Sequence, residues 1–210
     1  MNLRASLAVI LLGWSTAGCG FLPQAPRKLP VNHFVSDPRD FDTVRRVMVL
    51  PFDRAPGVLD DVDTIRTTFL SEFAKLGRFE VMPLPARASE HEEIHASVQR
   101  GRLSTDALVA LSERYQVDGV LIGSVTSYRA YPPMHLGIRL QLVSLHSGRT
   151  VWAAEGQYDA NDARVVEDVE HYARSFTAAE ASMHGWELNL ISPQKFTAFV
   201  AHRLVATCRP

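Results

Sequence analysis

Apolar and polar positions along this chain follow two successive patterns, the first typical of strands joined by helices and the second of adjacent strands. A near-continuous apolar run at 47–52 predicts a buried strand. From Val62 to Leu76 the apolar positions recur at intervals of three and four, which predicts a helix ended by Gly77. Two further strands, at 79–82 and 119–125, are expected with helices between them at 88–99 and 104–115.

From residue 136 the spacing of apolar positions changes. Leucines and an isoleucine in 136–142 alternate with Gly137, Arg139 and Gln141, as in a strand with one face exposed. A turn at 146–149 returns the chain as a fifth strand at 150–157, and helices are expected from about Asp162 and from Pro193. Helical crossovers suit parallel strands and tight turns suit antiparallel strands. The pattern therefore predicts an α/β fold, with a single mixed β-sheet of about five strands flanked by helices and extra C-terminal helices.

The N-terminus has the layout of a secretory signal peptide, in which Arg4 precedes an apolar stretch and small residues end at Cys19. This ending resembles the bacterial lipobox, where the cysteine becomes the lipidated first residue, although Thr16 stands where that pattern usually has leucine. Four prolines between residues 23 and 38 indicate an extended spacer. The expected organisation is a signal peptide at 1–18, a lipidated Cys19 with a proline-containing tether at 19–43, and one domain at 44–210.

Two other interpretations of the N-terminus stay open. The uncharged run from Ala5 to Pro23 is compatible with an uncleaved membrane anchor, although its glycines weaken a spanning helix. A plain cleaved secretory signal is the second alternative. In other lipoproteins an Asp directly after the cysteine retains the protein in the inner membrane, and here that position is Gly20. The prediction is therefore a lipid anchor in the outer membrane, with the domain facing the periplasm.

Composition narrows the function classes. The 210 residues include 22 Lys and Arg against 23 Asp and Glu, and the net charge of −1 argues against a strongly basic nucleic-acid binder. Two cysteines cannot form a disulfide-rich framework or a four-cysteine zinc site. Besides Cys19 the chain has only Cys208, close to a chain end where order is usually poor. Cys208 is expected to be a thiol without function, with an intermolecular disulfide as the alternative.

Several segments, taken in order, resemble one family of proteins. They are the opening strand at 47–52, the entry to the second strand at 77–81, the helix, turn and strand of 111–124, and the hairpin of 140–152. They resemble the CsgG/LpoB-like periplasmic lipoprotein family, which includes the curli secretion channel subunit and activators of a penicillin-binding protein. The resemblance covers residues 45–157, and the chain departs from the family pattern at 116–118 and 144–146.

The resemblance also implies what this chain lacks. The curli channel subunit inserts two β-hairpins into the membrane, and each such hairpin needs about 20 residues or more. The segment that corresponds to the first, 128–135, has only eight residues, and 158–180 carries acidic residues at helical spacing instead of alternating apolar ones. The chain is therefore expected to be a family-type domain without the membrane-spanning hairpins, and the role of 158–210 stays open.

One motif points to an enzyme. His91, Glu92 and His95 match H-E-x-x-H, in which two histidines one helical turn apart bind zinc and the glutamate activates water. The surrounding residues are polar, and a third ligand is needed, for which Glu167, Glu170 and His171 are candidates. The alternatives are a solvated charged helix or opportunistic metal binding. We expect the solvated helix, hence no catalytic residues, no metal site and no cofactor.

Two apolar stretches are candidate partner surfaces. The first is the loop with Tyr128, Tyr131, Pro132, Pro133 and Met134, whose aromatic residues are typical of binding hot spots, unless they fold back over the sheet. The second comprises Trp186, Leu188, Leu190 and Ile191, for which core packing is the simpler interpretation.

The sequence as a whole predicts a non-catalytic binding or scaffold module in envelope assembly, either in regulation of peptidoglycan synthesis or in an accessory role in export. The predicted partners are the membrane, through the lipid on Cys19, and an envelope protein, with no nucleic acid. A homo-oligomer is compatible with the resemblance. The alternative function is a zinc-dependent hydrolase that uses His91, Glu92 and His95.

Overall fold

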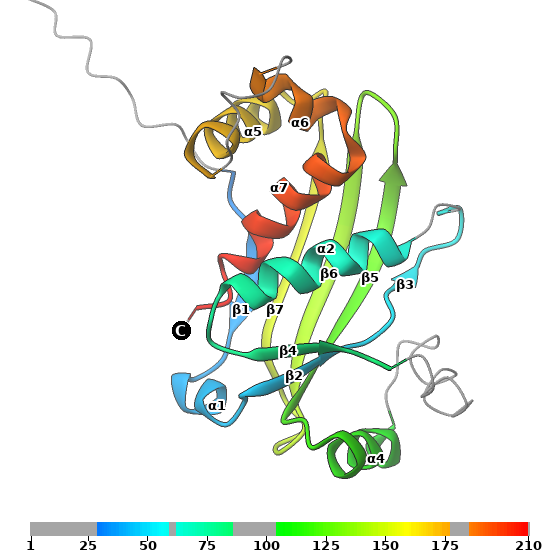
Figure 1. Cartoon of the computed structure of the whole chain (residues 1–210), viewed down its shortest axis with the longest axis vertical. Coiled ribbons are helices and arrows are strands. Elements are labelled where there is room, and N and C mark those ends of the chain that lie inside the picture. The colour runs from blue at the N-terminus through cyan, green and yellow to red at the C-terminus, as the bar shows by residue number, and fades with distance from the viewer. Residues whose placement is uncertain (1–28, 59–61, 86–103, 177–184, 210) are drawn as a thin grey trace, which may run out of the picture.

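A computed structural model describes residues 29–58, 62–85, 104–176 and 185–209 (Figure 1). Its strands are β1 (Asn32–Val35), β2 (Arg46–Val49), β3 (Asp53–Arg54), β4 (Glu80–Pro83), β5 (Gly119–Arg129), β6 (His135–Ser144) and β7 (Thr150–Asp159). Its helices are α1 (Pro38–Asp42), α2 (Val62–Lys75), α4 (Thr105–Tyr115), α5 (Ala163–Phe176), α6 (Leu188–Ile191) and α7 (Pro193–Val205), with a 3₁₀ turn, η3, at Gly185–Glu187.

The strands form one mixed sheet in the order β1-β7-β6-β5-β2-β4, with β3 paired to β5. β5, β6 and β7 are antiparallel neighbours joined by short connections, whereas β2 runs parallel to both β4 and β5. This division follows from the sequence, because helical crossovers return the chain to a parallel position and tight turns do not. The predicted α/β fold with a mixed sheet and C-terminal helices is confirmed, with β1 and β3 added to the five expected strands.

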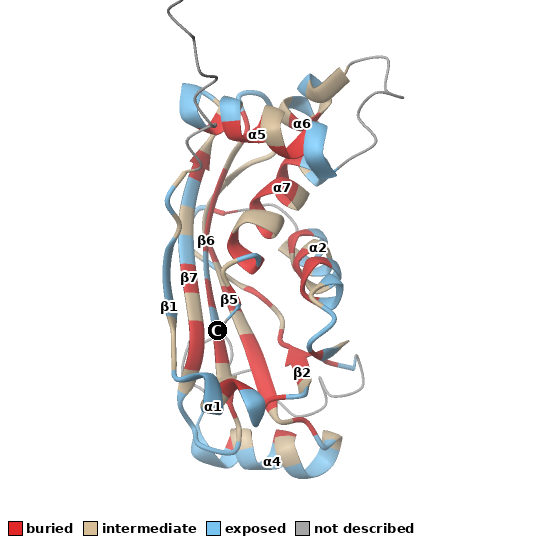
Figure 2. Ribbon diagram, turned by 90° about the vertical axis from the view of Figure 1, so that its left-hand side faces the viewer, coloured by how far each residue is buried: buried red, intermediate tan, exposed pale blue. Residues whose placement is uncertain are grey.

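One face of the sheet, called here the inner face, lies under α2, α7 and α5 (Figure 2). Inward residues of β6 and β7 are fully buried there, and Trp152 packs edge-on against Phe73 of α2 with ring centroids 5.4 Å apart. The apolar stripes that the spacing predicts on α2 and α7 therefore face the sheet. α7 begins as predicted, with Ser192 accepting a hydrogen bond from the backbone of Lys195 and Pro193 in its first turn.

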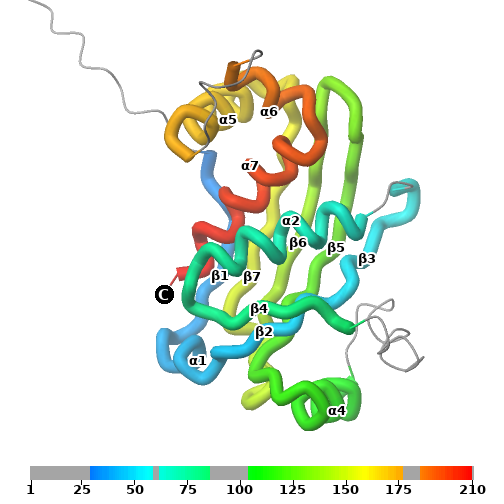
Figure 3. Tube along the Cα trace, in the orientation of Figure 1, coloured from blue at the N-terminus to red at the C-terminus, as the bar shows by residue number. Residues whose placement is uncertain are grey.

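The opposite, outer face is covered only at one end among the described residues. There α4 packs Leu111 against Met48 and Leu50 of the β2 segment and Val120 of β5. Figure 3 shows α4 at the end of the sheet away from α5. Along the rest of β6 and β7 the outer-face side chains, such as Arg139, Gln141 and Glu155, are exposed.

The domain begins before residue 44, the start that the sequence predicts. β1 pairs antiparallel with β7, and Phe41 of α1 is fully buried in the main core. In addition, the Arg203 guanidinium of α7 donates a hydrogen bond of 2.8 Å to the carbonyl of Leu29. Sheet pairing and core burial therefore include 29–43 in the domain, and any spacer ends before Leu29.

The expected loop at 128–135 is shorter than predicted, because β5 continues to Arg129 and β6 begins at His135. Cys208 also differs from its expected place in a poorly ordered tail. It lies in a turn after α7, in which its backbone N–H donates to the carbonyl of Val205, and it is 1% exposed within the main core. No helix among the described residues is long and apolar enough to cross a membrane.

Candidate functional site

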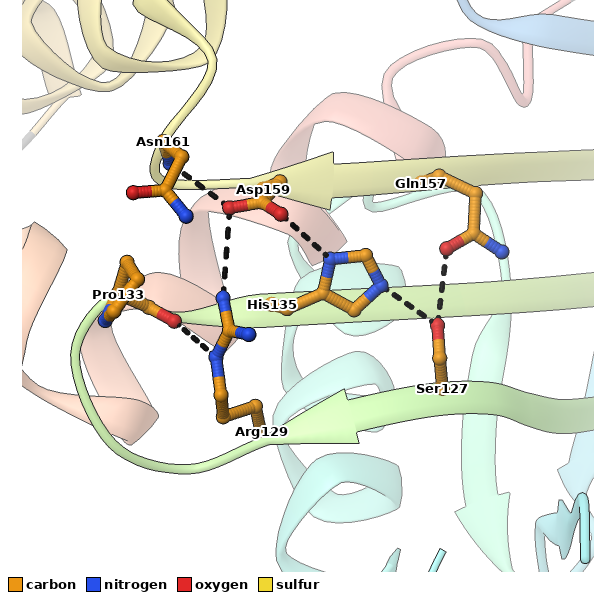
Figure 4. Close-up of polar contacts among 7 residues, drawn as sticks. All are labelled: Ser127, Arg129, Pro133, His135, Gln157, Asp159 and Asn161. Carbon is orange, nitrogen blue, oxygen red and sulfur yellow. Dashed lines mark hydrogen bonds and ion pairs between the residues drawn. The ribbon is translucent and has the colours of Figure 1, made fainter. Parts of the chain in front are cut away.

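The outer face carries a cluster of polar side chains near the β5–β6 hairpin, called here the outer-face network: Ser127, Arg129, His135, Gln157 and Asp159 (Figure 4). Sheet register brings these residues together. His135 lies opposite both Arg129 and Asp159, while Gly137 lies between Ser127 and Gln157. Because Gly137 has no side chain, the Ser127 hydroxyl and the Gln157 amide meet above it, with Oγ and Oε1 3.0 Å apart.

Three members of the network lie in the order that serine hydrolases use. The Ser127 Oγ is 2.8 Å from His135 Nε2, and His135 Nδ1 is 3.5 Å from Asp159 Oδ2. In a hydrolase the histidine accepts the serine proton as a general base. Here the Ser127 hydroxyl also donates a hydrogen bond to Gln157 Oε1, and it has only one hydrogen to give. The bond to Gln157 therefore competes with donation of the serine proton to His135.

The network instead fixes the base of the hairpin. Arg129 Nε donates a hydrogen bond to the carbonyl of Pro133, and its terminal nitrogen lies 3.6 Å from Asp159 Oδ1. The backbone N–H of Asn161 donates to Asp159 at 2.9 Å. This bond, helped by the charges of His135 and Arg129, holds the pKa of Asp159 below its ordinary value. Asp159 is therefore a carboxylate that ties the end of β7 to both strands of the hairpin.

The hairpin tip, residues 130–134, rises from this network. Tyr131 is 69% exposed, and Pro132 and Pro133, joined by a cis peptide bond, are also exposed. The backbone N–H of Ala160 donates to the carbonyl of Met134 at 2.8 Å, which attaches the tip to the chain that follows β7. An exposed aromatic ring is thus presented on a loop held by hydrogen bonds on both sides.

The predicted contact residues divide between the surface and the core. Tyr131 and Pro132 face outward as expected, but Met134 is wrong as a contact residue because it is 1% exposed in the main core. Tyr128 points to the inner face and is half-buried against that core, where it lines a small cavity with Ile65 and Pro193. Tyr128 and Met134 therefore pack against the sheet, which was the alternative to partner contact for residues of this loop.

Two adjacent depressions lie on the outer face beside β1, with volumes of about 270 and 220 Å³. Both are lined by Asn32, Arg139 and Glu155. Arg139 Nε and Glu155 Oε2 form an exposed ion pair of 2.9 Å. These depressions extend the polar surface from the outer-face network to the β1 edge of the sheet.

Other residues singled out by sequence lie elsewhere. Cys19 and the motif formed by His91, Glu92 and His95 are outside the described residues. Of the candidate third ligands, Glu170 pairs with Arg174 at 2.6 Å. Within residues 29–58, 62–85, 104–176 and 185–209, no three His, Cys, Asp or Glu side chains gather as a metal site would require.

The second predicted surface and the free thiol are largely internal. Trp186 and Leu190 are half-buried against the main core, as the core-packing alternative expects, whereas Ile191 is 49% exposed. Burial raises the pKa of the Cys208 thiol to about 12, so the thiolate needed for disulfide exchange is scarce at neutral pH.

Sequence reasoning missed the outer-face network. Its signal was present in β6, where polar residues and glycine alternate with apolar ones, but the partners on β5 and β7 depend on the register of the two hairpins. The glycine at 137 was a further sign, because glycine within a strand often marks a place where neighbouring groups approach closely.

No family model matches the sequence, and no curated protein matches it. Solved structures with a similar fold include a PelC variant dodecamer from Paraburkholderia phytofirmans, with 13% identity over 85% of this chain and 94% of that chain and a TM-score of 0.45. Lipoprotein GNA1162 from Neisseria meningitidis is similar at 19% identity over 63% of this chain and 99% of that one, with a TM-score of 0.37.

The LpoB C-terminal domain from Escherichia coli is similar at 16% identity over 55% of this chain and 83% of that chain, with a TM-score of 0.37. LpoB gives its name to the group that the sequence resembles over residues 45–157. At this identity the likeness concerns the fold alone and assigns no activity or partner to the chain.

Proposed function

We propose that this chain is an outer-membrane lipoprotein, anchored by acyl chains on Cys19, whose domain binds an envelope protein through the hairpin tip. The observation that carries this function is the exposed ring of Tyr131 on a loop fixed by Arg129 and by the backbone of Ala160. The domain acts as a binding or scaffold module and not as a catalyst.

The tip has the properties of a binding hot spot. Tyrosine is enriched at such positions because its ring buries a large area while its hydroxyl forms a hydrogen bond. A loop already held in one conformation loses less conformational entropy on binding. Tyr131 and Pro132 meet both conditions, since they are exposed and the residues on either side of the tip are hydrogen-bonded to the sheet.

The biological setting rests on the sequence. The lipobox at Cys19 supports an envelope location, and the resemblance over residues 45–157 supports two roles, regulation of peptidoglycan synthesis or an accessory role in export. The partner is accordingly a protein of the cell envelope, met by a domain attached to the membrane through its N-terminus.

Site-specific photo-crosslinking tests the tip. A photoreactive phenylalanine analogue replaces Tyr131 in the full-length chain in cells, and the matched control carries it at Arg149, which is exposed on the β6–β7 turn at the other end of the hairpins. We expect one defined envelope protein at position 131 and not at 149, and weaker recovery of that protein by the Tyr131→Ala chain. Equal products at the two positions, or none at 131, would contradict docking through the tip.

Metabolic labelling with an alkyne analogue of palmitate tests the anchor. Cys19→Ser should abolish the label and release the protein from membranes, because covalent acyl chains provide the attachment. Cys208→Ser is the matched control and should keep the label, since Cys208 is buried. A label that survives Cys19→Ser would refute acylation at this residue.

A further inference from the structure

The two edges of the sheet differ in how they are protected against pairing with another strand. β4 forms one edge and contains Pro83, and its Glu80 is paired with Arg46 at 3.1 Å. Proline and charged residues are the usual means of blocking an edge strand. β1 lies at the other edge (Figure 1) and has neither proline nor a charged residue within Asn32–Val35. Its Phe34 is 53% exposed.

The hydrogen-bond pattern shows which groups of β1 face the free edge. The backbone N–H of Ser36 donates to the carbonyl of Val151 on β7 at 2.9 Å. In an antiparallel pair, hydrogen-bonded and non-hydrogen-bonded positions alternate along each strand. Counting back from Ser36, Phe34 bonds toward β7, whereas His33 and Val35 direct their N–H and C=O groups away from the sheet. Among the described residues no strand pairs with that side.

We infer that β1 pairs antiparallel with β1 of a second copy of this chain, on a two-fold axis through Phe34. New hydrogen bonds require that residues with free groups face one another. In a two-fold antiparallel pair this places His33 opposite Val35 of the second copy, and Val35 opposite its His33. Both pairs exchange two hydrogen bonds, so the joined edges satisfy all four free groups of His33 and Val35 in each copy.

The same register places the exposed aromatic ring on the axis. Phe34 lies opposite Phe34 of the second copy at a non-hydrogen-bonded position, where facing side chains come closest. Both rings lie on the outer face, because Phe34 is in register with Ala153 of β7. No like charges face one another, and an apolar ring that is half-exposed in one copy gains an apolar neighbour.

The prolines that flank β1 are symmetric about the same residue. Pro30 lies four residues before Phe34 and Pro38 four residues after it, so the two face one another in the proposed register. Since α1 begins at Pro38, the extended chain ends at 37, and the two-fold symmetry confines the added pairing to 31–37. Such an interface is smaller than the ~1,200 Å² of a stable complex, so dimerisation should be reversible and depend on concentration.

Cysteine crosslinking in membranes tests the register. Full-length chains carrying Phe34→Cys, His33→Cys or Tyr131→Cys are oxidised in isolated membranes and compared with the unsubstituted chain on non-reducing gels. At Phe34 the two Cα atoms would be about 4.5 Å apart, within reach of a disulfide. We expect a covalent homodimer from Phe34→Cys, several-fold above His33→Cys, whose own copies are offset in this register, and above Tyr131→Cys on the distant tip.

Equal homodimer yields from Phe34→Cys and Tyr131→Cys would overturn the proposed pairing. A disulfide from Phe34→Cys to a different protein would overturn it too, because a foreign strand would then occupy the edge. The comparison with the unsubstituted chain removes any contribution of Cys19. The outcome does not depend on lipidation or on the partner of the tip, so it stands or fails apart from the proposed function.

Proline substitution separates edge pairing from folding. His33→Pro removes an N–H that faces the free edge, whereas Phe34→Pro removes one that bonds to β7. By sedimentation velocity of the detergent-solubilised full chain, His33→Pro should shift the protein to monomer at concentrations where the unsubstituted chain dimerises. Its thermal unfolding midpoint should stay close to that of the unsubstituted chain and well above that of Phe34→Pro. An unchanged dimer in His33→Pro would contradict the pairing.

Discussion

The inner and outer faces of the β5–β6–β7 sheet are made by alternate residues of the same strands, yet they differ in burial and in chemistry. Along β6 the residues Leu140 and Leu142 are completely buried under helices, while Arg139 and Gln141 between them are exposed. The inner face joins sheet to helices by apolar packing, whereas the outer face carries hydrogen-bonded polar groups in contact with solvent. Stability should therefore depend on the first face and recognition on the second.

Two ion pairs make the contrast concrete. Arg203 and Asp168, which join α7 to α5 in the helical layer, approach to 2.7 Å and are nearly buried, with side chains 13% and 4% exposed. Arg139 and Glu155 on the outer face approach to 2.9 Å but are 57% and 49% exposed. The distances are similar, but water screens only the second pair, so removing one partner should have unequal costs.

Removal of a large inner side chain should have the largest effect. Trp152→Ala should lower the free energy of unfolding by about 3–5 kcal/mol, because it leaves a cavity beside the Phe73 ring. It also removes the hydrogen bond from Trp152 Nε1 to Thr207 Oγ1. Gln141→Ala, on the outer face one strand away, is the matched control and should change stability by less than about 0.5 kcal/mol. Urea unfolding followed by circular dichroism measures both, and similar losses would erase the distinction between the faces.

The ion pairs provide the next comparison. Asp168→Ala should cost about 3 kcal/mol, since it leaves the Arg203 guanidinium buried without its carboxylate. Glu155→Ala should cost about 0.2–1 kcal/mol, because Arg139 stays in water. Denaturant unfolding at low and at high salt tests this: only the small Glu155 effect should shrink with salt. A cost for Glu155→Ala that equals that of Asp168→Ala would contradict the difference in burial.

The fold was more predictable than the site, because periodicity depends on local spacing whereas the site depends on pairing. Alternation identified β6, and three-and-four spacing identified α2 and α7. β1 escaped prediction because Asn32 and His33 are polar and lie among prolines, and its position depends on β7, more than a hundred residues away. No local pattern could supply that pairing.

Met134 shows how a local signal was outweighed by its neighbours. It follows an exposed Tyr-Pro-Pro sequence, which indicates a surface loop, yet it continues the period of two set by Leu136 and Ile138. Extending that period by one step predicts the burial that the structure shows. Cys208 is similar, since its nearness to the chain end indicated disorder while the turn after α7 returns it to the core.

Adding one methyl group at a glycine of each face tests how much space the two faces leave. In Gly123→Ala, the new Cβ would lie 2.4–2.7 Å from ring carbons of Phe52, which is packed against Phe69. The strain should cost about 1–3 kcal/mol, because a buried ring has no space to move into. In Gly137→Ala the Cβ would meet only the ends of the Ser127 and Gln157 side chains, which can turn toward solvent.

Gly137→Ala should therefore change stability by less than about 1 kcal/mol while it separates Ser127 from Gln157. Thermal unfolding compares the two variants, and NMR of the Gln157 side-chain amide reports the loss of the network. If Gly137→Ala destabilised the protein more than Gly123→Ala, close approach on the outer face would matter more for stability than packing on the inner face.

The smallest expected effect concerns how the free energy of unfolding changes as the pH falls. Glu72 of α2 is buried next to α7, and burial by itself raises its pKa, but hydrogen bonds from His202 and Lys75 outweigh it and hold the pKa below its ordinary value of 4.5. A lowered pKa in the folded state means that the unfolded chain binds the proton first as pH falls. The stability that Glu72 contributes is thus fully present above pH 4.5 and is lost as the pH falls through the lower folded value.

Glu72→Gln should accordingly reduce stability at neutral pH, and its difference from the unsubstituted chain should shrink on acidification below pH 4.5. Asp159→Asn is the outer-face control. The pKa of Asp159 is lowered too, mainly by the backbone N–H of Asn161, but its side chain is 40% exposed, so its acid-dependent difference should be smaller. Urea unfolding at several pH values gives both curves. A larger acid dependence at Asp159 would mean that the outer-face network, and not the helical layer, governs how stability responds to pH.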